Sequence, residues 1–177
     1  MELFGTAGIR GDVRETVTPS LALRVGQAAA ADARAEGEGS VEFVVARDGR
    51  ETGQALVDAM ASGLAAAGAD VVEIGQAPTP ALAYASQGRY GVAITASHNP
   101  PEDNGIKLFV DGVEYSGAAE ARIEGRIADE TEPTAWDEWG HRESAETLDT
   151  YRDAVVEYAE RFGADRDGIR VVVDCGN

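Results

Sequence analysis

Basic residues are scarce in this chain of 177 residues, and lysine is almost absent. The chain has 15 Lys and Arg residues against 32 Asp and Glu residues, so its formal net charge is -17. Lys107 is the single lysine. Binding to nucleic acid or to an anionic membrane requires clustered Lys and Arg side chains. We therefore expect no nucleic-acid partner and no membrane partner.

Cysteine and long apolar runs are lacking too. Cys175 is the single cysteine, which excludes a disulfide within the chain and a metal cluster built from several cysteines. No run approaches the roughly 18 apolar residues that span a membrane, and residues 1–5 are not a basic segment followed by an apolar stretch. These absences predict a soluble, cytoplasmic protein in a reducing compartment.

The acidic residues are spread along the whole chain. Since 44% of the residues are hydrophobic and the apolar positions are periodic, we expect a folded protein, not a disordered acidic one. An acidic surface repels itself at low ionic strength, and salt screens that repulsion. The composition therefore suggests a salt-adapted, halophilic source.

Apolar periodicity predicts an alternation of helices and strands. Thr18-Pro19 is a typical helix start, with Thr as the N-cap and Pro in the first turn. Asn104-Gly105 predicts a tight turn that sends the strand 106–110 back beside the strand 91–95. The expected helices cover residues 18–36, 52–67, 78–86, 116–128 and 148–162, and the expected strands 41–46, 71–74, 91–95, 106–110 and 168–174.

This order predicts an α/β fold with three α/β/α layers around a mixed, mostly parallel sheet. The apolar stripe of the helix 148–162 is expected to be core. We assign residues 1–163 to one α/β domain and residues 164–177 to the first strand of a second domain, because no helix follows that strand. Its apolar residues Val171, Val172 and Val173 could add to a neighbouring sheet edge, which predicts a strand-mediated homodimer.

Thr95-Ala96-Ser97-His98-Asn99-Pro100 follows the short apolar run 91–94. This pattern is typical of a buried strand that presents a loop of reactive side chains. A hydrolase would need a histidine to deprotonate Ser97, but His98 is its direct neighbour and no Gly-x-Ser-x-Gly motif is present. We therefore favour transfer of a phosphoryl group to and from the Ser97 hydroxyl.

Phosphoryl transfer needs positive charge around the phosphate and a group that moves the hydroxyl proton. Residues 4–11 place three glycines around Arg10, and such a segment can bring backbone amides and a guanidinium to an anion. His98 is a further donor, and Lys107 is a candidate proton acceptor. An ordinary glycine-rich turn and a solvated strand-end lysine are the structural alternatives.

Three segments in this order resemble the N-terminal domain of the α-D-phosphohexomutases. They are Phe4-Gly5-Thr6-Ala7-Gly8-Ile9-Arg10-Gly11, the hexapeptide 95–100, and Asn104-Gly105-Ile106-Lys107. The resemblance extends from Leu3 to the Val-Val-Val-Asp-Cys-Gly-Asn of residues 171–177, which opens the second domain in relatives. This family comprises phosphoglucomutases, phosphomannomutases and phosphoglucosamine mutases.

The resemblance implies that Ser97 carries the phosphate, which moves between the 1 and 6 positions of a hexose phosphate through a bisphosphorylated sugar. It implies that this phosphate gives one oxygen to a Mg²⁺ ion. His98 and Lys107 match residues assigned to phosphate contact and proton transfer, and Arg10 matches one that lines the phosphoryl site. The resemblance leaves glucose, mannose and glucosamine phosphates open as substrates.

Several family motifs do not occur in this sequence. These are the metal-binding Asp-Gly-Asp-x-Asp loop, the Glu-containing sugar loop and the phosphate-binding loop of the later domains. Asp48, Asp103 and Asp111 are spaced as turn residues and are not expected to bind metal. We therefore expect no turnover from this chain alone, and the alternative function is a non-catalytic α/β module that binds phosphorylated ligands.

Overall fold

Several helices begin at the residues that the sequence marks as starts. In the computed structural model, which describes residues 3–37, 39–163 and 167–174, the Thr18 hydroxyl accepts the Leu21 N–H at 3.2 Å and Pro19 lies in the first turn of the first helix. The helices are α1 (Pro19–Glu36), α2 (Gly53–Ala66), α3 (Thr79–Ala85), α4 (Gly117–Ala128) and α5 (Leu148–Glu160). All five lie where the periodicity predicts them.

The strands form one seven-stranded sheet. They are β1 (Ile9–Asp12), β2 (Val41–Arg47), β3 (Ala69–Gln76), β4 (Tyr90–Ile94), β5 (Asp103–Val110), β6 (Val113–Glu114) and β7 (Arg142–Ser144). Their order is β1-β5-β4-β2-β3-β7, and β6 pairs with β5. Since β5 is antiparallel to β1, β4 and β6, while β4, β2, β3 and β7 are mutually parallel, β5 alone runs against the others.

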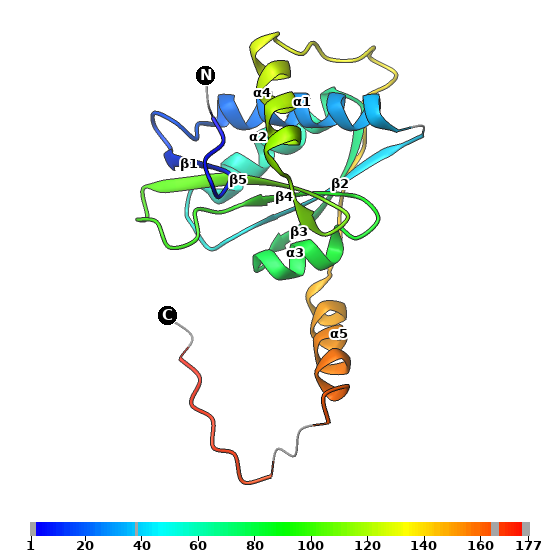
Figure 1. Ribbon diagram of the computed structural model, residues 1–177. Coiled ribbons are helices and arrows are strands. Elements are labelled where there is room, and N and C mark those ends of the chain that lie inside the picture. Colours follow the sequence, from blue (N-terminus) through cyan, green and yellow to red (C-terminus); the bar gives the residue numbers. More distant parts are fainter. Residues whose placement is uncertain (1–2, 38, 164–166, 175–177) are drawn as a thin grey trace.

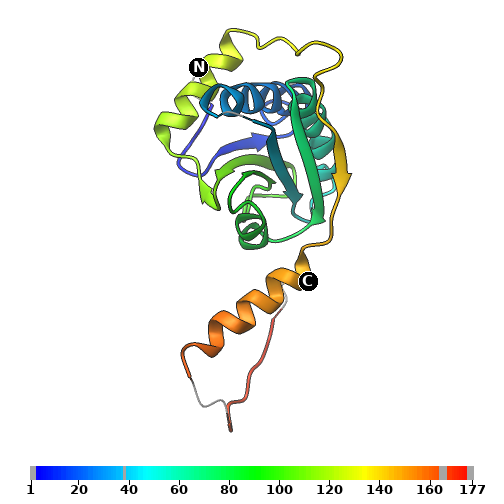
Figure 2. The same ribbon diagram turned by 90° about the vertical axis from the view of Figure 1, so that its right-hand side faces the viewer.

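Helices cover both faces of this sheet, as the sequence predicts (Figures 1 and 2). One core lies between the sheet and α1, α2 and α4, and its largest buried side chains include Phe43, Leu64 and Ile106. A smaller core lies beneath α3 on the opposite face. The expected three-layer α/β/α arrangement with a mostly parallel sheet is confirmed.

The prediction of a tight turn at Asn104-Gly105 is wrong. Both residues lie within β5, where they pair with β1, and Asn104 is fully buried. A Cβ atom on Gly105 would lie 2.4 Å from the Thr95 carbonyl oxygen and 2.8 Å from that of Ile9. Glycine is therefore needed here for close approach of three backbone segments, and the chain reverses earlier, in residues 95–102.

Helix α5 is not core, contrary to the expectation. It has no buried residue, and Val156 and Tyr158 are exposed by about half. The helix extends away from the sheet (Figure 1) and contacts α3 through the rings of Tyr151 and Tyr84, whose centroids are 5.8 Å apart. Amphipathic periodicity thus marks a face that can be buried, but no described element covers most of this one.

The predicted strand 168–174 is not formed in this structure. Residues 169–174 belong to no helix or strand, and Val171, Val172 and Val173 are exposed. A strand requires a neighbouring strand to satisfy its backbone groups, and none of the described strands pairs with this segment. Cys175 and the end of the expected second-domain strand lie outside the described residues, so the boundary after residue 163 stays a prediction.

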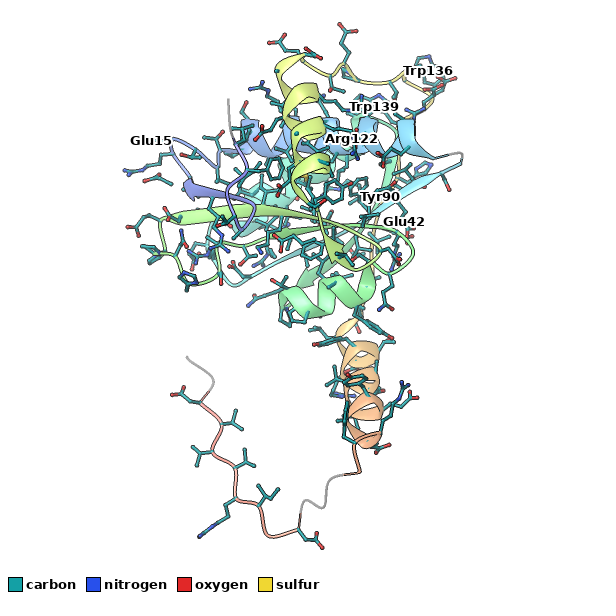
Figure 3. All side chains as sticks on the ribbon, viewed as in Figure 1. Glu15, Glu42, Tyr90, Arg122, Trp136 and Trp139 are labelled. Carbon is teal, nitrogen blue, oxygen red and sulfur yellow. The ribbon has the colours of Figure 1, made fainter. Side chains whose placement is uncertain are left out.

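The acidic segment between α4 and α5 wraps around an edge of the sheet. Trp136 and Trp139 lie at the periphery of the molecule (Figure 3), and Trp136 is the more exposed of the two. Segment 142–144 adds β7 to the edge of β3. Throughout the described ranges, no helix is both long enough and apolar enough to cross a bilayer.

Candidate active site

The loop that carries Ser97 lies at the carboxyl end of β4, beside the carboxyl end of β2. These two strands are parallel neighbours, with Arg47 opposite Ile94. The first residue after β2, Asp48, donates its backbone N–H to the Ile94 carbonyl oxygen at 3.0 Å. The two loops that follow these strands are therefore held together, at the sheet edge where open α/β proteins place their ligands.

Ser97 has an unusual backbone conformation. Its φ is +56°, a left-handed value that non-glycine residues adopt rarely. Its N–H donates to the Thr95 hydroxyl oxygen at 3.0 Å, and the Thr95 hydroxyl donates to Asp48 Oδ2 at 2.7 Å. Thr95 is buried while Ser97 is exposed. The buried threonine thus anchors an exposed serine, the placement that a nucleophile requires.

Ser97 and His98 line a cavity of about 400 Å³. The opposite walls come from the ends of β2 and β3 and from the start of α3, and they contribute Asp48 and Thr79. The structure therefore brings Ser97 and His98 together with the carboxyl ends of three parallel strands. This volume lies in the range of small-ligand sites.

Arg10 lies at a second cavity, of about 450 Å³, lined by residues 3–8, Arg10 and Asn99. Its Nη1 donates to Asn99 Oδ1 at 3.5 Å, the outer limit of a hydrogen bond. Its Nε is buried and has no partner among the described residues. A half-buried guanidinium with unused donors, beside a glycine-rich backbone segment, suits an anionic ligand.

The glycine-rich segment before Arg10 packs closely on β5. Gly8 has a φ of +80°, and a Cβ atom there would lie 2.5 Å from the Ile106 carbonyl oxygen. Glycine therefore lets this backbone approach the sheet edge. That these glycines bring backbone amides to an anion stays a prediction, and β1, which begins at Ile9, was not among the expected strands.

Lys107 does not line either cavity. It lies on β5 opposite Ala93 of β4, and its Nζ donates to both carboxylate oxygens of Glu114 at 2.9 Å. The structure therefore brings Ser97 and His98 together at one cavity. Arg10 lies at the neighbouring cavity, where it contacts Asn99 of the Ser97 loop. The Lys107 ammonium is held by Glu114. A proton acceptor needs a free lone pair, so that role would require Lys107 to leave Glu114.

Sequence reasoning missed Arg50 and Asp48. Arg50 follows β2, and the sequence predicts only that Asp48 is a turn residue. Instead the Arg50 guanidinium folds back over the Ser97 loop. It donates to the backbone carbonyl oxygens of Ser97, Asn99, Pro100 and Asp103. The sequence signal that could have identified them is an Asp and an Arg, two residues apart, directly after a strand whose carboxyl end lies at the ligand-binding edge of the sheet.

The described residues do not form a complete magnesium site. They include no group of three His, Cys, Asp or Glu side chains that could hold a metal ion. Asp48, which lines the same cavity as Ser97, is already bonded through both oxygens to Thr95 and Arg50. That Asp48, Asp103 and Asp111 are not metal ligands stays a prediction.

Together, the fold and this site define a class: an α/β/α domain that presents a serine hydroxyl on a hydrogen-bonded loop beside an arginine with unused donors. Residues 1–134 match the family model described as phosphoglucomutase/phosphomannomutase, alpha/beta/alpha domain I. The chain therefore belongs to the phosphoglucomutase/phosphomannomutase family, as its motifs predict.

Individual relatives agree with this assignment. The chain is 37% identical over 180 residues to phosphoglucosamine mutase of Pelotomaculum thermopropionicum and 40% identical over 184 residues to that of Paracoccus denitrificans, covering 99% of this chain in each case. A phosphoglucomutase/phosphomannomutase family protein of Burkholderia thailandensis superposes with a TM-score of 0.79 and 35% identity, over 88% of this chain and 35% of that one. The chain spans 40% of the length of both curated relatives.

Proposed function

We propose that this chain is the nucleophile-bearing domain of a phosphohexomutase. Ser97 Oγ takes a phosphoryl group from a hexose bisphosphate or returns it to a hexose monophosphate. In the return step the bond from phosphorus to Ser97 Oγ breaks, a bond to a sugar hydroxyl oxygen forms, and that hydroxyl proton passes to a base. The observation that carries the proposal is the exposed Ser97 held at a φ of +56° between two hydrogen-bonded loops.

The neighbouring side chains suit this role. Arg10 has unused donors next to a glycine-rich backbone, and His98 lines the same cavity as Ser97. Both can contact phosphate oxygens, which carry most of the charge during the transfer. Lys107 takes part in the proton transfer only if it leaves Glu114. The hexose can be a glucose, mannose or glucosamine phosphate.

A magnesium ion belongs to the proposed complete enzyme. Bound to an oxygen of the Ser97 phosphate, it would neutralise charge on the transferred group. Apart from that phosphate, the described residues offer no set of metal ligands. The sugar and metal loops of the family are absent from the sequence. We therefore expect these 177 residues alone to accept one phosphate on Ser97 but not to complete the mutase cycle.

The phosphate on Ser97 tests the proposal directly. Intact-mass measurement after incubation with a hexose 1,6-bisphosphate should show one added phosphate on the wild-type chain and none on Ser97→Ala. Thr95→Ser keeps the anchoring hydroxyl and is the matched control, so it should still gain the phosphate. Equal phosphate content in the wild type and Ser97→Ala would favour the alternative, a binding module that holds phosphorylated ligands without reacting.

We also propose a homodimer mediated by the apolar segment 171–173. Val172 is 96% exposed, and an exposed apolar extended segment can pair with the same segment of a second copy. Light scattering should give a dimer mass for the whole chain and a monomer mass for a chain that ends at Gly168. A monomer in both cases would remove this proposal.

A further inference from the structure

Arg50 uses every hydrogen-bond donor that an arginine has. A guanidinium carries five N–H groups. Nε donates to Asp48 Oδ2 at 3.1 Å, and the two Nη atoms donate four bonds to backbone oxygens of the Ser97 loop. The side chain is only 12% exposed. No N–H group of Arg50 therefore remains for a ligand while this arrangement holds.

Arg10 and Arg50 thus differ in how many of their hydrogen-bond donors are used, although both lie beside the loop. Arg10 makes one bond, at 3.5 Å, and buries an Nε without a partner among the described residues. Arg50 has five good acceptors. An arginine that binds an incoming phosphate needs free donors, so the two guanidinium groups separate into a ligand-binding residue and a residue that acts through the loop.

The loop that Arg50 holds needs stabilising hydrogen bonds from residues outside the loop. The left-handed conformation of Ser97 costs energy unless surrounding contacts compensate for it. Arg50 bonds the carbonyl of Ser97 itself, and Asp48 accepts the hydroxyl of Thr95, which accepts the N–H of Ser97. Asp48 and Arg50 are also paired with each other at 3.1 Å. Both peptide groups of Ser97 are therefore connected to the same ion pair.

We propose that Arg50, together with Asp48, is a positioning residue that fixes the Ser97 hydroxyl for phosphoryl transfer without touching the substrate. This inference rests on the proposed function. In the step concerned, the phosphorus–oxygen bond of a hexose bisphosphate breaks, the bond from phosphorus to Ser97 Oγ forms, and the serine proton leaves with the sugar oxygen. A displacement of about 1 Å of one reacting group can slow such a step about 100-fold.

The kinetic signature separates positioning from ligand contact. Loss of a ligand contact raises the bisphosphate concentration that gives half the maximal rate, whereas loss of positioning lowers the maximal rate and leaves that concentration unchanged. Arg50→Lys keeps the charge but has three donors in place of five, so at least two of the five side-chain hydrogen bonds to the loop and Asp48 are lost. Asp48→Asn keeps the shape but removes the charge of the ion pair.

The experiment measures two quantities on the whole chain. One is the rate of phosphate addition to Ser97, by intact mass, over a series of glucose 1,6-bisphosphate concentrations. The other is amide hydrogen exchange of the peptide that covers residues 96–103. Arg34→Lys is the matched control, because Arg34 also donates to a backbone carbonyl and pairs with a glutamate, but at Ala67 and Glu138. Thermal unfolding verifies that each variant folds.

We expect Arg50→Lys and Asp48→Asn to lower the maximal rate by about 10-fold to 100-fold at an unchanged half-saturating concentration, with faster exchange in residues 96–103. Arg34→Lys should change neither quantity. Unchanged exchange in Arg50→Lys, faster exchange with an unchanged rate, or a raised half-saturating concentration would each overturn the proposal. If the wild type gains no phosphate, the proposed function fails, while the exchange data still decide whether Arg50 holds the loop.

Discussion

At the scale of single residues, the side chains with the most hydrogen bonds are not the ones that we propose to bind ligands. Arg50 and Asp48 are saturated by each other and by the loop, while Ser97 is exposed and Arg10 keeps a buried donor without a described partner. A reacting group has to be accessible, and the residues that hold it have to be occupied. The division of roles follows from which donors are already used.

The structure lowers the pKa of Asp12. The Arg14 side chain donates two hydrogen bonds to its carboxylate and the Arg14 backbone N–H donates a third, and these bonds lower the pKa of Asp12 to about 2. A lowered pKa means that the ionised form stabilises the fold. This contribution is complete above the ordinary aspartate pKa of about 3.9 and is lost as the pH falls through about 2.

We predict that Arg14→Gln returns the pKa of Asp12 toward its ordinary value, measured by carboxyl-carbon NMR titration. The wild type should be more stable than the variant at pH 5, and the difference should shrink as the pH falls through the window between the two pKa values. Arg152→Gln, which removes an arginine paired with exposed Asp149, should leave the Asp12 titration unchanged. A midpoint that does not move in Arg14→Gln would contradict the assigned cause.

At the scale of elements, an ion-pair cluster ties α4 to α1. The Asp32 side chain of α1 is 3% exposed, and the Arg122 and Arg126 side chains of α4 each reach its carboxylate at 3.0 Å. Figure 3 shows Arg122 on the helix that crosses α1. A buried carboxylate without a partner is far more costly than one that is paired. The cluster therefore fixes how α4 covers the core.

We predict that the double variant Arg122→Met/Arg126→Met lowers the free energy of unfolding by about 3 kcal/mol, because it leaves the buried Asp32 carboxylate without a partner. Adding Asp32→Asn to this variant should recover part of the loss, since the charge is then removed. Urea unfolding of the wild type, the double variant and the triple variant provides the comparison. A triple variant as unstable as the double one would show that packing, not the buried charge, causes the loss.

At the scale of the whole molecule, charge of one sign dominates. Surface ion pairs, such as Arg142 with Asp58 and Glu73, offset part of the net charge of -17 locally. The 32 acidic residues nevertheless outnumber the 15 basic ones. Repulsion between like charges favours the expanded, unfolded chain. Salt shortens the range of this repulsion, from about 10 Å at 0.1 M to about 3 Å at 1 M.

We predict that the urea midpoint of unfolding rises when KCl is increased from about 0.1 M to about 1 M, over the range in which the screening length falls roughly threefold. The rise should be equal in NaCl, because screening depends on ionic strength and not on the cation. Sucrose, which stabilises without screening, is the control for excluded-solute effects. A midpoint that is indifferent to salt would speak against the halophilic assignment.

Much of this protein could be predicted without its structure. The periodicity located all five helices, and the type and order of residues in 95–100 and 4–11 identified the family. That the loop reacts and that Arg10 binds an anion stay predictions. These signals are local, because capping, strand alternation and turn chemistry depend on residues a few positions apart. Two predictions were wrong: a tight turn at Asn104-Gly105 and a buried apolar face on α5. Both were drawn from local patterns, which do not specify which surfaces of the chain come into contact.

The sequence by itself therefore determined the family, the α/β/α class and the serine that reacts in the proposed function. Only the tertiary structure decided that Arg50 and Asp48 hold Ser97, across 47 residues of chain, and that Lys107 pairs with Glu114. The physical reason is that parallel strands bring their carboxyl ends together whatever their separation in the sequence. Which donor meets which acceptor at that edge is settled by packing in three dimensions, not by spacing along the chain.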